Sequence, residues 1–254
     1  MAKVFRDTRL LFAANLRTTL RNPVWVIVGL FQPICYLLLF APLLANLAGV
    51  PGFPKGGAYS VFTPGLLIMM AIFSVSFAGF GLIAGLRAGV VERLRVTPVN
   101  RFALVLGLVA RDVAVLLVQG ALLLGLACAL GLRPDLVGAL LALALLVLVG
   151  LTMASASYGL ALALKDENAL ASTVNLFALP LLLLSGITLP LSLAPEVLRR
   201  IAQANPFAYA VDAARALMRG NLGDVAVAQA FVIFGVLAVL ALVWATRAMR
   251  QATI

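Results

Sequence analysis

The residues best suited to form specific polar interactions make up a short charged segment, residues 87–101, between two long apolar runs. Its charged side chains are Arg87, Glu92, Arg93, Arg95 and Arg101. A charged residue at the centre of a bilayer costs roughly 2.5 to 3.5 kcal/mol on insertion scales. The segment is therefore expected to lie in water or among lipid headgroups, where its charges can form ion pairs.

The same segment has the pattern of a short helix with one apolar stripe. Val90, Val91 and Leu94 fall on that stripe at helical spacing. The pair Thr97-Pro98 ends the helix, because the residue before a proline is pushed towards extended geometry. Two interpretations remain open: a basic cytoplasmic loop that obeys the positive-inside rule, or a docking helix for a soluble partner.

Motifs for catalysis, nucleotide binding and metal binding are missing from the sequence. There is no GxxxxGK sequence to cradle a phosphate, no HExxH motif and no histidine at all. The acidic residues are all expected near membrane boundaries, which disfavours a proton-coupled transporter: Asp7, Glu92, Asp112, Asp166, Glu167, Glu196, Asp212 and Asp224. We therefore expect no catalytic residue, cofactor site or metal site in this chain.

Composition identifies an integral membrane protein. The 254 residues are 64% hydrophobic and 11% charged, against roughly 45 to 50% and 25% for a soluble domain. The net charge of +10 comes mostly from basic residues that flank apolar runs, so lipid phosphates rather than nucleic acid are the expected counterions. Cys35 and Cys128 lie in apolar runs, where disulfide or metal chemistry has little support.

The apolar runs predict a single all-α transmembrane domain over residues 1–254 with six spans. A run of about 20 apolar residues reaches across a bilayer. The predicted spans are residues 24–46, 65–85, 101–131, 137–164, 170–189 and 225–246. Arg111 and Asp112 are expected to mark where the third span leaves the headgroups, Gly81 and Gly85 to form a small-residue face, and Thr152, Ser155, Ser157 and Tyr158 to bond neighbouring helices.

Residues 1–22 predict an amphipathic helix in the membrane interface. Phe5, Phe12, Leu16 and Leu20 recur at helical spacing, opposite Arg6, Arg17 and Arg21. The segment lacks the apolar centre and cleavage site of a signal peptide. A mitochondrial transit peptide has a similar pattern and is the alternative.

The connecting segments differ in character. Residues 49–64 are expected to form an outer loop, and residues 190–224 an outer helical hairpin. Residues 86–100 and 165–168 are expected to be cytoplasmic connections. In the hairpin, Pro195 begins one helix, Asn205-Pro206 begins a second, and Gly220-Asn221 ends it. With these assignments 13 of the 19 Lys and Arg residues lie inside, which predicts that both termini are cytoplasmic.

Three segments together resemble the permease subunits of type 2 ABC exporters, the class that includes the daunorubicin-resistance-like drug, lipid and polysaccharide permeases. YSVFTPGL at 59–66 is similar to the family's Y-x-x-F-x-x-PG motif, and ERLRVTPVNR at 92–101 to its E-R-L-x-x-T-P-x-x-R motif. Residues 181–217 are similar to its SG-x-x-x-P and NP-x-x-Y-x-x-D-x-x-R hairpin. The resemblance covers nearly the whole chain.

The resemblance implies a role for each segment. Residues 86–100 would be the coupling helix that docks on an ATPase, through Arg87, Val90, Val91, Glu92, Arg93, Leu94, Arg95 and Pro98. The hairpin would form the extracellular gate, with Ser185, Gly186, Pro190, Asn205, Pro206, Tyr209, Asp212 and Arg215. Candidates for the transport pathway are Gln32, Pro33, Tyr36, Phe62, Phe73 and Phe77.

The resemblance also implies partners and a location. Two copies of a cytoplasmic ABC ATPase would bind ATP and Mg, and the permease would pair with a second copy of itself or a paralogue in the bacterial inner membrane. The low aromatic content, 8%, favours a hydrophobic drug, natural product or lipid over a glycan. A polysaccharide or glycolipid exporter, a secondary transporter and a membrane scaffold without an ATPase are the alternatives.

Overall fold

The computed structural model describes residues 2–21, 24–45, 57–88, 101–187 and 195–252. All regular structure in these ranges is helical, with no strand. The all-α fold class predicted from the sequence is therefore confirmed. The helices are α1 (Ala2–Arg21), α2 (Val24–Ala45), α3 (Gly57–Ser76), α4 (Gly79–Arg87), α6 (Arg101–Ala129), α7 (Leu136–Leu164), α8 (Glu167–Leu183), α9 (Glu196–Ala202), α10 (Pro206–Met218) and α11 (Val225–Ala252).

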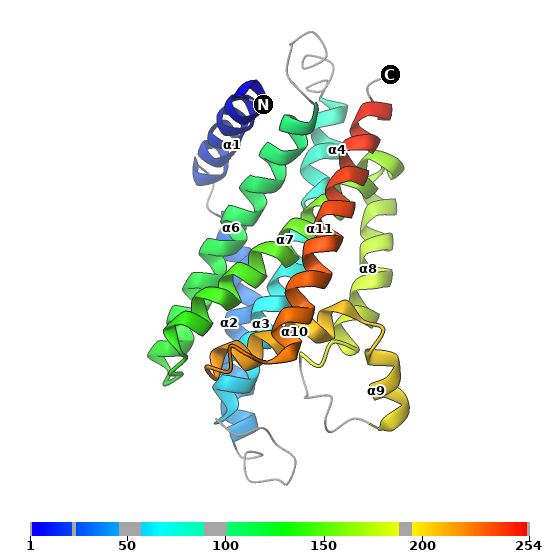
Figure 1. Ribbon diagram of the computed structural model, residues 1–254. Helices are drawn as coiled ribbons and strands as arrows, with labels where there is room; N and C mark the ends of the chain where they lie inside the picture. The colour runs from blue at the N-terminus through cyan, green and yellow to red at the C-terminus, as the bar shows by residue number, and fades with distance from the viewer. Residues whose placement is uncertain (1, 22–23, 46–56, 89–100, 188–194, 253–254) are drawn as a thin grey trace.

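Three of these helices, α6, α7 and α11, are long and apolar enough to cross a membrane. The axes of α1 and α2 differ by 69°, and a fourth crossing results if that bent pair forms one span. The helices α2, α3, α4 and α8 run alongside the long ones in the bundle (Figure 1). The chain is thus a multi-pass membrane protein, and the count of six spans stays a prediction.

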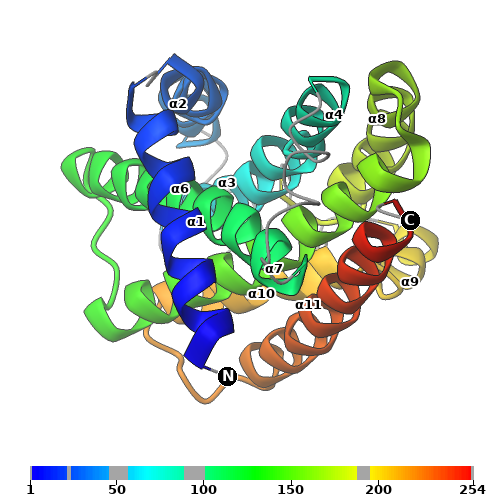
Figure 2. The same cartoon turned by 90° about the horizontal axis from the view of Figure 1, so that it is seen from above.

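Helix α7 lies at the centre of the bundle. It contacts α3, α4, α6, α8, α10 and α11, and Figure 2 shows the other helices arranged around it. Asp135 caps its first turn by accepting a hydrogen bond of 2.8 Å from the Gly138 N–H. Small residues let neighbours come close to α7, and most of one face of the helix is buried.

The two ends of the bundle carry different elements. Helix α1 begins and α11 ends at one end, while α9 and α10 lie at the other (Figure 1). Helix α1 crosses over α6 (Figure 2), and a Cβ added at Gly107 of α6 would lie 2.9 Å from the Leu11 Cβ. The absence of a side chain at Gly107 therefore allows the two helices to pack closely.

The second predicted span, residues 65–85, differs from the structure in two ways. Helix α3 begins earlier, at Gly57, so residues 57–64 are helical and do not belong to the expected loop. Val61, Phe62 and Thr63 are buried, and that packing keeps this turn helical despite Pro64. The span is also interrupted at Phe77 and Ala78, where α3 gives way to α4.

A side chain from α7 stabilises this interruption. The Ser157 hydroxyl donates to the Ser76 carbonyl at 2.5 Å and accepts from the Gly79 N–H at 2.9 Å. These bonds satisfy backbone groups at the point where the two helices separate. The break therefore depends on a residue 78 positions away from Gly79, which local sequence cannot reveal.

Candidate functional site

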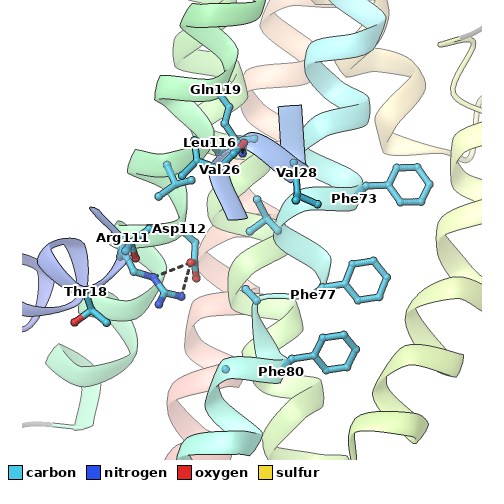
Figure 3. Close-up of a pocket in the computed structure, with 16 residues that line it drawn as sticks. Thr18, Val26, Val28, Phe73, Phe77, Phe80, Arg111, Asp112, Leu116 and Gln119 are labelled. Carbon is cyan, nitrogen blue, oxygen red and sulfur yellow. Dashed lines mark hydrogen bonds and ion pairs between the residues drawn. The ribbon is translucent and has the colours of Figure 1, made fainter. Parts of the chain in front are cut away.

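A partly open cavity of about 600 Å³ lies between α1, α2, α3, α4 and α6. Figure 3 shows its lining side chains, with the polar groups of α6 on one side and a row of three phenylalanines, Phe73, Phe77 and Phe80, that project from α3, α4 and the turn between them on the other. The side chains around it are mostly apolar. The lining residues are Thr18, Thr19, Val26, Val28, Gly29, Phe73, Val75, Phe77, Ala78, Phe80, Gly81, Arg111, Asp112, Val115, Leu116 and Gln119.

An ion pair on α6 forms the polar wall. Arg111 Nη2 lies 2.5 Å from Asp112 Oδ1, and the side chains are 24% and 14% exposed. Tyr158 of α7 completes the cluster: its hydroxyl donates to Asp112 Oδ2 and accepts a bond of 3.2 Å from Arg111 Nη2. Both carboxylate oxygens therefore have a donor, and the charges of Arg111 and Asp112 offset one another.

This cluster corrects one part of the sequence-based interpretation of Arg111 and Asp112. They were expected to mark the headgroup boundary and not to form a buried pair, yet both are largely enclosed by protein and lie in the cavity wall. The reason is tertiary: Tyr158, 46 residues further along the chain, bonds to Asp112. A partly buried ion pair with an added hydroxyl donor can stay inside a helical bundle. Their position at the headgroup boundary stays a prediction.

Gln119 adds a second polar group to the same face of α6. It is 2% exposed, and its Nε2 donates a hydrogen bond of 3.0 Å to the Val26 carbonyl of α2. Its Oε1 is buried and has no hydrogen-bond partner among the described residues. The amide therefore holds α2 against α6, and one buried acceptor of this cavity-lining residue is left without a described partner.

Aromatic side chains mark the other edge of the cavity. The rings of Phe73 on α3, Phe80 on α4 and Phe77 in the turn between them project on the side away from Arg111 and Asp112 (Figure 3). The rings of Phe77 and Phe80 stack, with centroids 5.4 Å apart and an angle of 23° between their planes. The cavity is thus amphipathic, with polar groups on one edge and aromatic groups on the other.

Four of the six pathway candidates meet in a smaller adjoining cavity of about 200 Å³. Gln32, Pro33, Phe73 and Phe77 line it, and Val28 and Gly29 are shared with the larger one. Tyr36 is half-buried against the core and lines neither cavity. Phe62 also lines neither cavity, because it is buried in the core.

At the opposite end of the bundle, Arg215 joins three elements. The residue is 5% exposed. Arg215 Nε donates to the Val61 carbonyl of α3 at 3.1 Å, and Nη2 to the Gly186 carbonyl beyond α8 at 2.7 Å. Burial lowers the pKa of Arg215, and the Asp212 carboxylate 3.6 Å away opposes that shift. The residue therefore links α3, α10 and the end of α8.

The backbone around Gly186 and Gly65 is adapted to this junction. Gly186 lies in the turn that follows α8 and has φ 72°, a backbone conformation that residues with a Cβ disfavour. A Cβ at Gly65 would lie 2.9 Å from the Ile187 carbonyl oxygen. The glycine of the 59–66 motif thus lets α3 pass against the chain that leaves α8.

The remaining gate candidates that the structure describes lie at the start of α10, along α10 and just after α8. Asn205 caps α10 by accepting from the Phe207 N–H at 3.0 Å, with Pro206 at the next position, and its Nδ2 donates to the Leu181 carbonyl at 2.8 Å. Ser185 is buried, and its hydroxyl donates to the Leu182 carbonyl at 2.6 Å. The Tyr209 hydroxyl donates to the Gln203 carbonyl at 3.1 Å. Asp212 is half-exposed. Pro190 lies outside the described residues.

Of the docking candidates, only Arg87 lies within the described residues. It sits at the end of α4, 58% exposed, and its guanidinium lies 3.6 Å from Asp166 and 3.3 Å from Glu167 at the start of α8. It therefore bridges α4 and the turn between α7 and α8. The others, Val90, Val91, Glu92, Arg93, Leu94, Arg95 and Pro98, lie outside the described residues.

Sequence reasoning missed the polar wall of the larger cavity. Asp112 and Gln119 are seven residues apart, so they share one helical face, and that spacing within an apolar run was an available signal. Phe80, which lines the same cavity, carried no comparable signal. In the part of the chain that the structure describes, no three His, Cys, Asp or Glu side chains gather where a metal ion could bind.

Comparison with known proteins agrees with this architecture. The model of the ABC-2 type transporter family matches residues 6–218. The chain is 26% identical over 211 residues to the daunorubicin resistance ABC transporter permease protein DrrB1 of Streptomyces coeruleorubidus, covering 79% of this chain and 71% of the relative. It is 28% identical over 202 residues to a transport permease, ycf38, of Pyropia yezoensis, covering 78% and 68%. The chain therefore belongs to the ABC-2 type transporter family and is a permease of the type 2 ABC class.

Proposed function

We propose that the chain is the membrane-spanning subunit of an ATP-driven exporter. It moves a hydrophobic small molecule, natural product or lipid out of the cytoplasm or inner leaflet by alternating access. The match to the family over residues 6–218 carries this proposal. The amphipathic cavity beside α6 supports the substrate class, as does the similarity to a permease named for daunorubicin resistance.

The proposed partners follow from the same observations. The sequence has no phosphate-binding loop, so ATP and Mg would bind to a separate ATPase, two copies of which dock on residues 86–100. A second copy of the chain, or a paralogue, completes the permease. Exposed apolar side chains on α2 and α8, among them Phe31, Leu39, Leu176 and Phe177, suit packing against lipid or that second copy.

The proposed orientation places the six spans at α2, α3 with α4, α6, α7, α8 and α11. Both termini face the cytoplasm across a bacterial inner membrane. The distribution of basic residues supports this, since 13 of 19 fall on one side under this assignment. The start of α1 and the end of α11 also lie at one end of the bundle (Figure 1).

In this orientation the Arg215 junction belongs to the extracellular gate. Arg215 holds α3 and the turn after α8 through backbone carbonyls. Helices joined through one side chain can separate when those bonds are exchanged for water. Opening of the gate would therefore involve release of the Val61 and Gly186 carbonyls.

A polysaccharide or glycolipid exporter is the second candidate. Aromatic faces stack on sugar rings, and Phe73, Phe77 and Phe80 lie along one edge of the cavity. The cavity nevertheless has few polar groups, whereas a glycan needs many hydrogen-bond partners. The first candidate is therefore preferred.

The test is reconstitution of the permease with its ATPase in inverted membrane vesicles, with ATP-dependent daunorubicin accumulation as the measurement. Leu94→Asp should abolish ATPase co-purification and transport, because it puts a charge on the apolar docking stripe. Arg95→Ala is the matched control and should change association by about 0 to 1 kcal/mol. Transport by well-folded Leu94→Asp at the wild-type rate would contradict the docking role.

A further inference from the structure

We propose that the 600 Å³ cavity is a binding site for a drug-sized amphipathic molecule that has a carbonyl or hydroxyl acceptor at one end and a hydroxyl or amine donor further along. Arg111 would bond the acceptor, Gln119 the donor, and the phenylalanine row would contact an apolar body. This inference rests on the proposed export function and assigns the substrate class to one site.

The free acceptor of Gln119 is the first argument. Gln119 lines the cavity, and its Oε1 is buried without a partner among the described residues, while its Nε2 donates to the Val26 carbonyl. A buried acceptor without a donor is costly, so such groups usually meet a ligand or water. A hydroxyl or amine on a bound molecule would supply the missing donor.

The geometry of Arg111 is the second argument. Its Nε and Nη2 both bond to Asp112 Oδ1, at 2.9 Å and 2.5 Å, and Nη2 also bonds to Tyr158. Arg111 Nη1 makes no hydrogen bond to a described residue, so its N–H groups remain for a ligand. The adjacent Asp112 carboxylate offsets the positive charge of Arg111. The site therefore favours a neutral acceptor over a phosphate, which would also face Asp112.

Size and spacing are the third argument. Arg111 and Gln119 are eight residues apart on one helix, about 12 Å along its axis. Val115 and Leu116 lie between them in the cavity wall. The volume falls within the roughly 300 to 1,000 Å³ of sites for drug-sized ligands. A rigid polycyclic molecule with polar groups at separated positions fits these constraints.

Two glycines of α4 offer a matched steric test. A Cβ added at Gly81 or at Gly85 meets no atom within 4 Å, so a side chain is tolerated at either position. Gly81 lines the cavity, whereas Gly85, one turn further along, is not among its lining residues. Gly81→Phe should therefore fill the site, and Gly85→Phe should leave it open.

The experiment measures binding of daunorubicin, a polycyclic molecule with carbonyl, hydroxyl and amine groups, by its fluorescence on the purified permease in lipid nanodiscs. Gly81→Phe should raise Kd at least tenfold, and Gly85→Phe should leave it within twofold. Gln119→Leu should raise Kd about fivefold through loss of one hydrogen bond. Leu122→Ala, on an exposed position of the same helix, should have no effect on Kd.

Three results would overturn the proposal. One is daunorubicin binding that Gly81→Phe leaves unchanged, and another is equal loss in Gly81→Phe and Gly85→Phe. The third is a wild-type protein that binds short-chain phosphatidylcholine but not daunorubicin, together with a Gly81→Phe variant that no longer binds the phosphatidylcholine. That result would make the cavity a lipid site. Binding is measured without the ATPase. A permease that binds daunorubicin but does not transport it would therefore contradict the proposed export function and leave the proposed binding site intact.

Discussion

Single polar side chains decide the local geometry of this bundle. Ser157 satisfies the backbone where α3 ends and α4 begins, and Arg215 bonds two carbonyls from other segments. In a bundle with so little polar surface, each such bond has few substitutes. Loss of one partner then leaves buried backbone groups unpaired.

Ser157→Ala should lower the free energy of unfolding by about 1 to 3 kcal/mol, because the Ser76 carbonyl and the Gly79 N–H lose their partner. Ser155→Ala is the control on the same helix. The Ser155 hydroxyl is buried with no partner among the described residues, so its removal should be neutral or stabilising. Urea unfolding in detergent compares the two, and equal losses would argue against the role of Ser157.

Arg215→Met should destabilise the fold by about 2 to 4 kcal/mol, since the Val61 and Gly186 carbonyls are left without this donor. Arg215→Lys should recover only part of the loss, because one ammonium cannot reproduce the fork of a guanidinium. Arg219→Met, at an exposed position of the same helix end, should stay within about 0.5 kcal/mol. The thermal midpoint of each variant in one detergent is the measurement.

At the scale of elements, the two helices of the hairpin differ in their surroundings. Helix α10 is buried along most of its length, whereas Ala202 is the single buried residue of the seven in α9. Val197, Leu198 and Ile201 of α9 are exposed. The hairpin thus combines a helix fixed in the core with one that lies at its edge.

Amide hydrogen exchange should therefore be at least tenfold slower in α10 than in α9, because exchange follows the free energy of local opening. Mass spectrometry of overlapping peptides from the intact protein in nanodiscs would measure this difference. Fast exchange throughout both helices would show that the segment is an open loop.

At the scale of the whole molecule, the length of the helices and the charge distribution support the proposed orientation. Helices α6, α7 and α11 supply membrane length, and α1 lies across α6 near one end of the bundle. The basic residues expected on the cytoplasmic side include Arg247 and Arg250 of α11, at the end where α1 begins. The proposed orientation rests on these charges and not on packing.

Single cysteines in a background without Cys35 and Cys128 test that orientation. Glu196→Cys on α9 should react with an impermeant maleimide from outside intact cells, and Arg247→Cys on α11 should react only after the membrane is opened. Both positions are exposed on the protein, so burial does not limit the reaction. Reaction of Arg247→Cys in intact cells would reverse the assigned topology.

The sequence by itself determined the class of fold and much of the helix layout. Long apolar runs without charges require backbone bonds satisfied within each segment, so a helical membrane domain follows from composition. Asn205-Pro206 and Pro195 stand at the starts of α10 and α9 because these signals act through neighbouring residues. The motifs also carried the resemblance to the ABC-2 family.

Tertiary structure decided which side chains share a site. The wall of the larger cavity depends on Tyr158 bonding to Asp112 and on Gln119 bonding to Val26, pairs that are 46 and 93 residues apart. The same is true of the break at Phe77 and Ala78, which a serine from α7 stabilises, and of the helical turn before Pro64. Such features arise from contacts between helices, whose distances no local pattern of residues specifies.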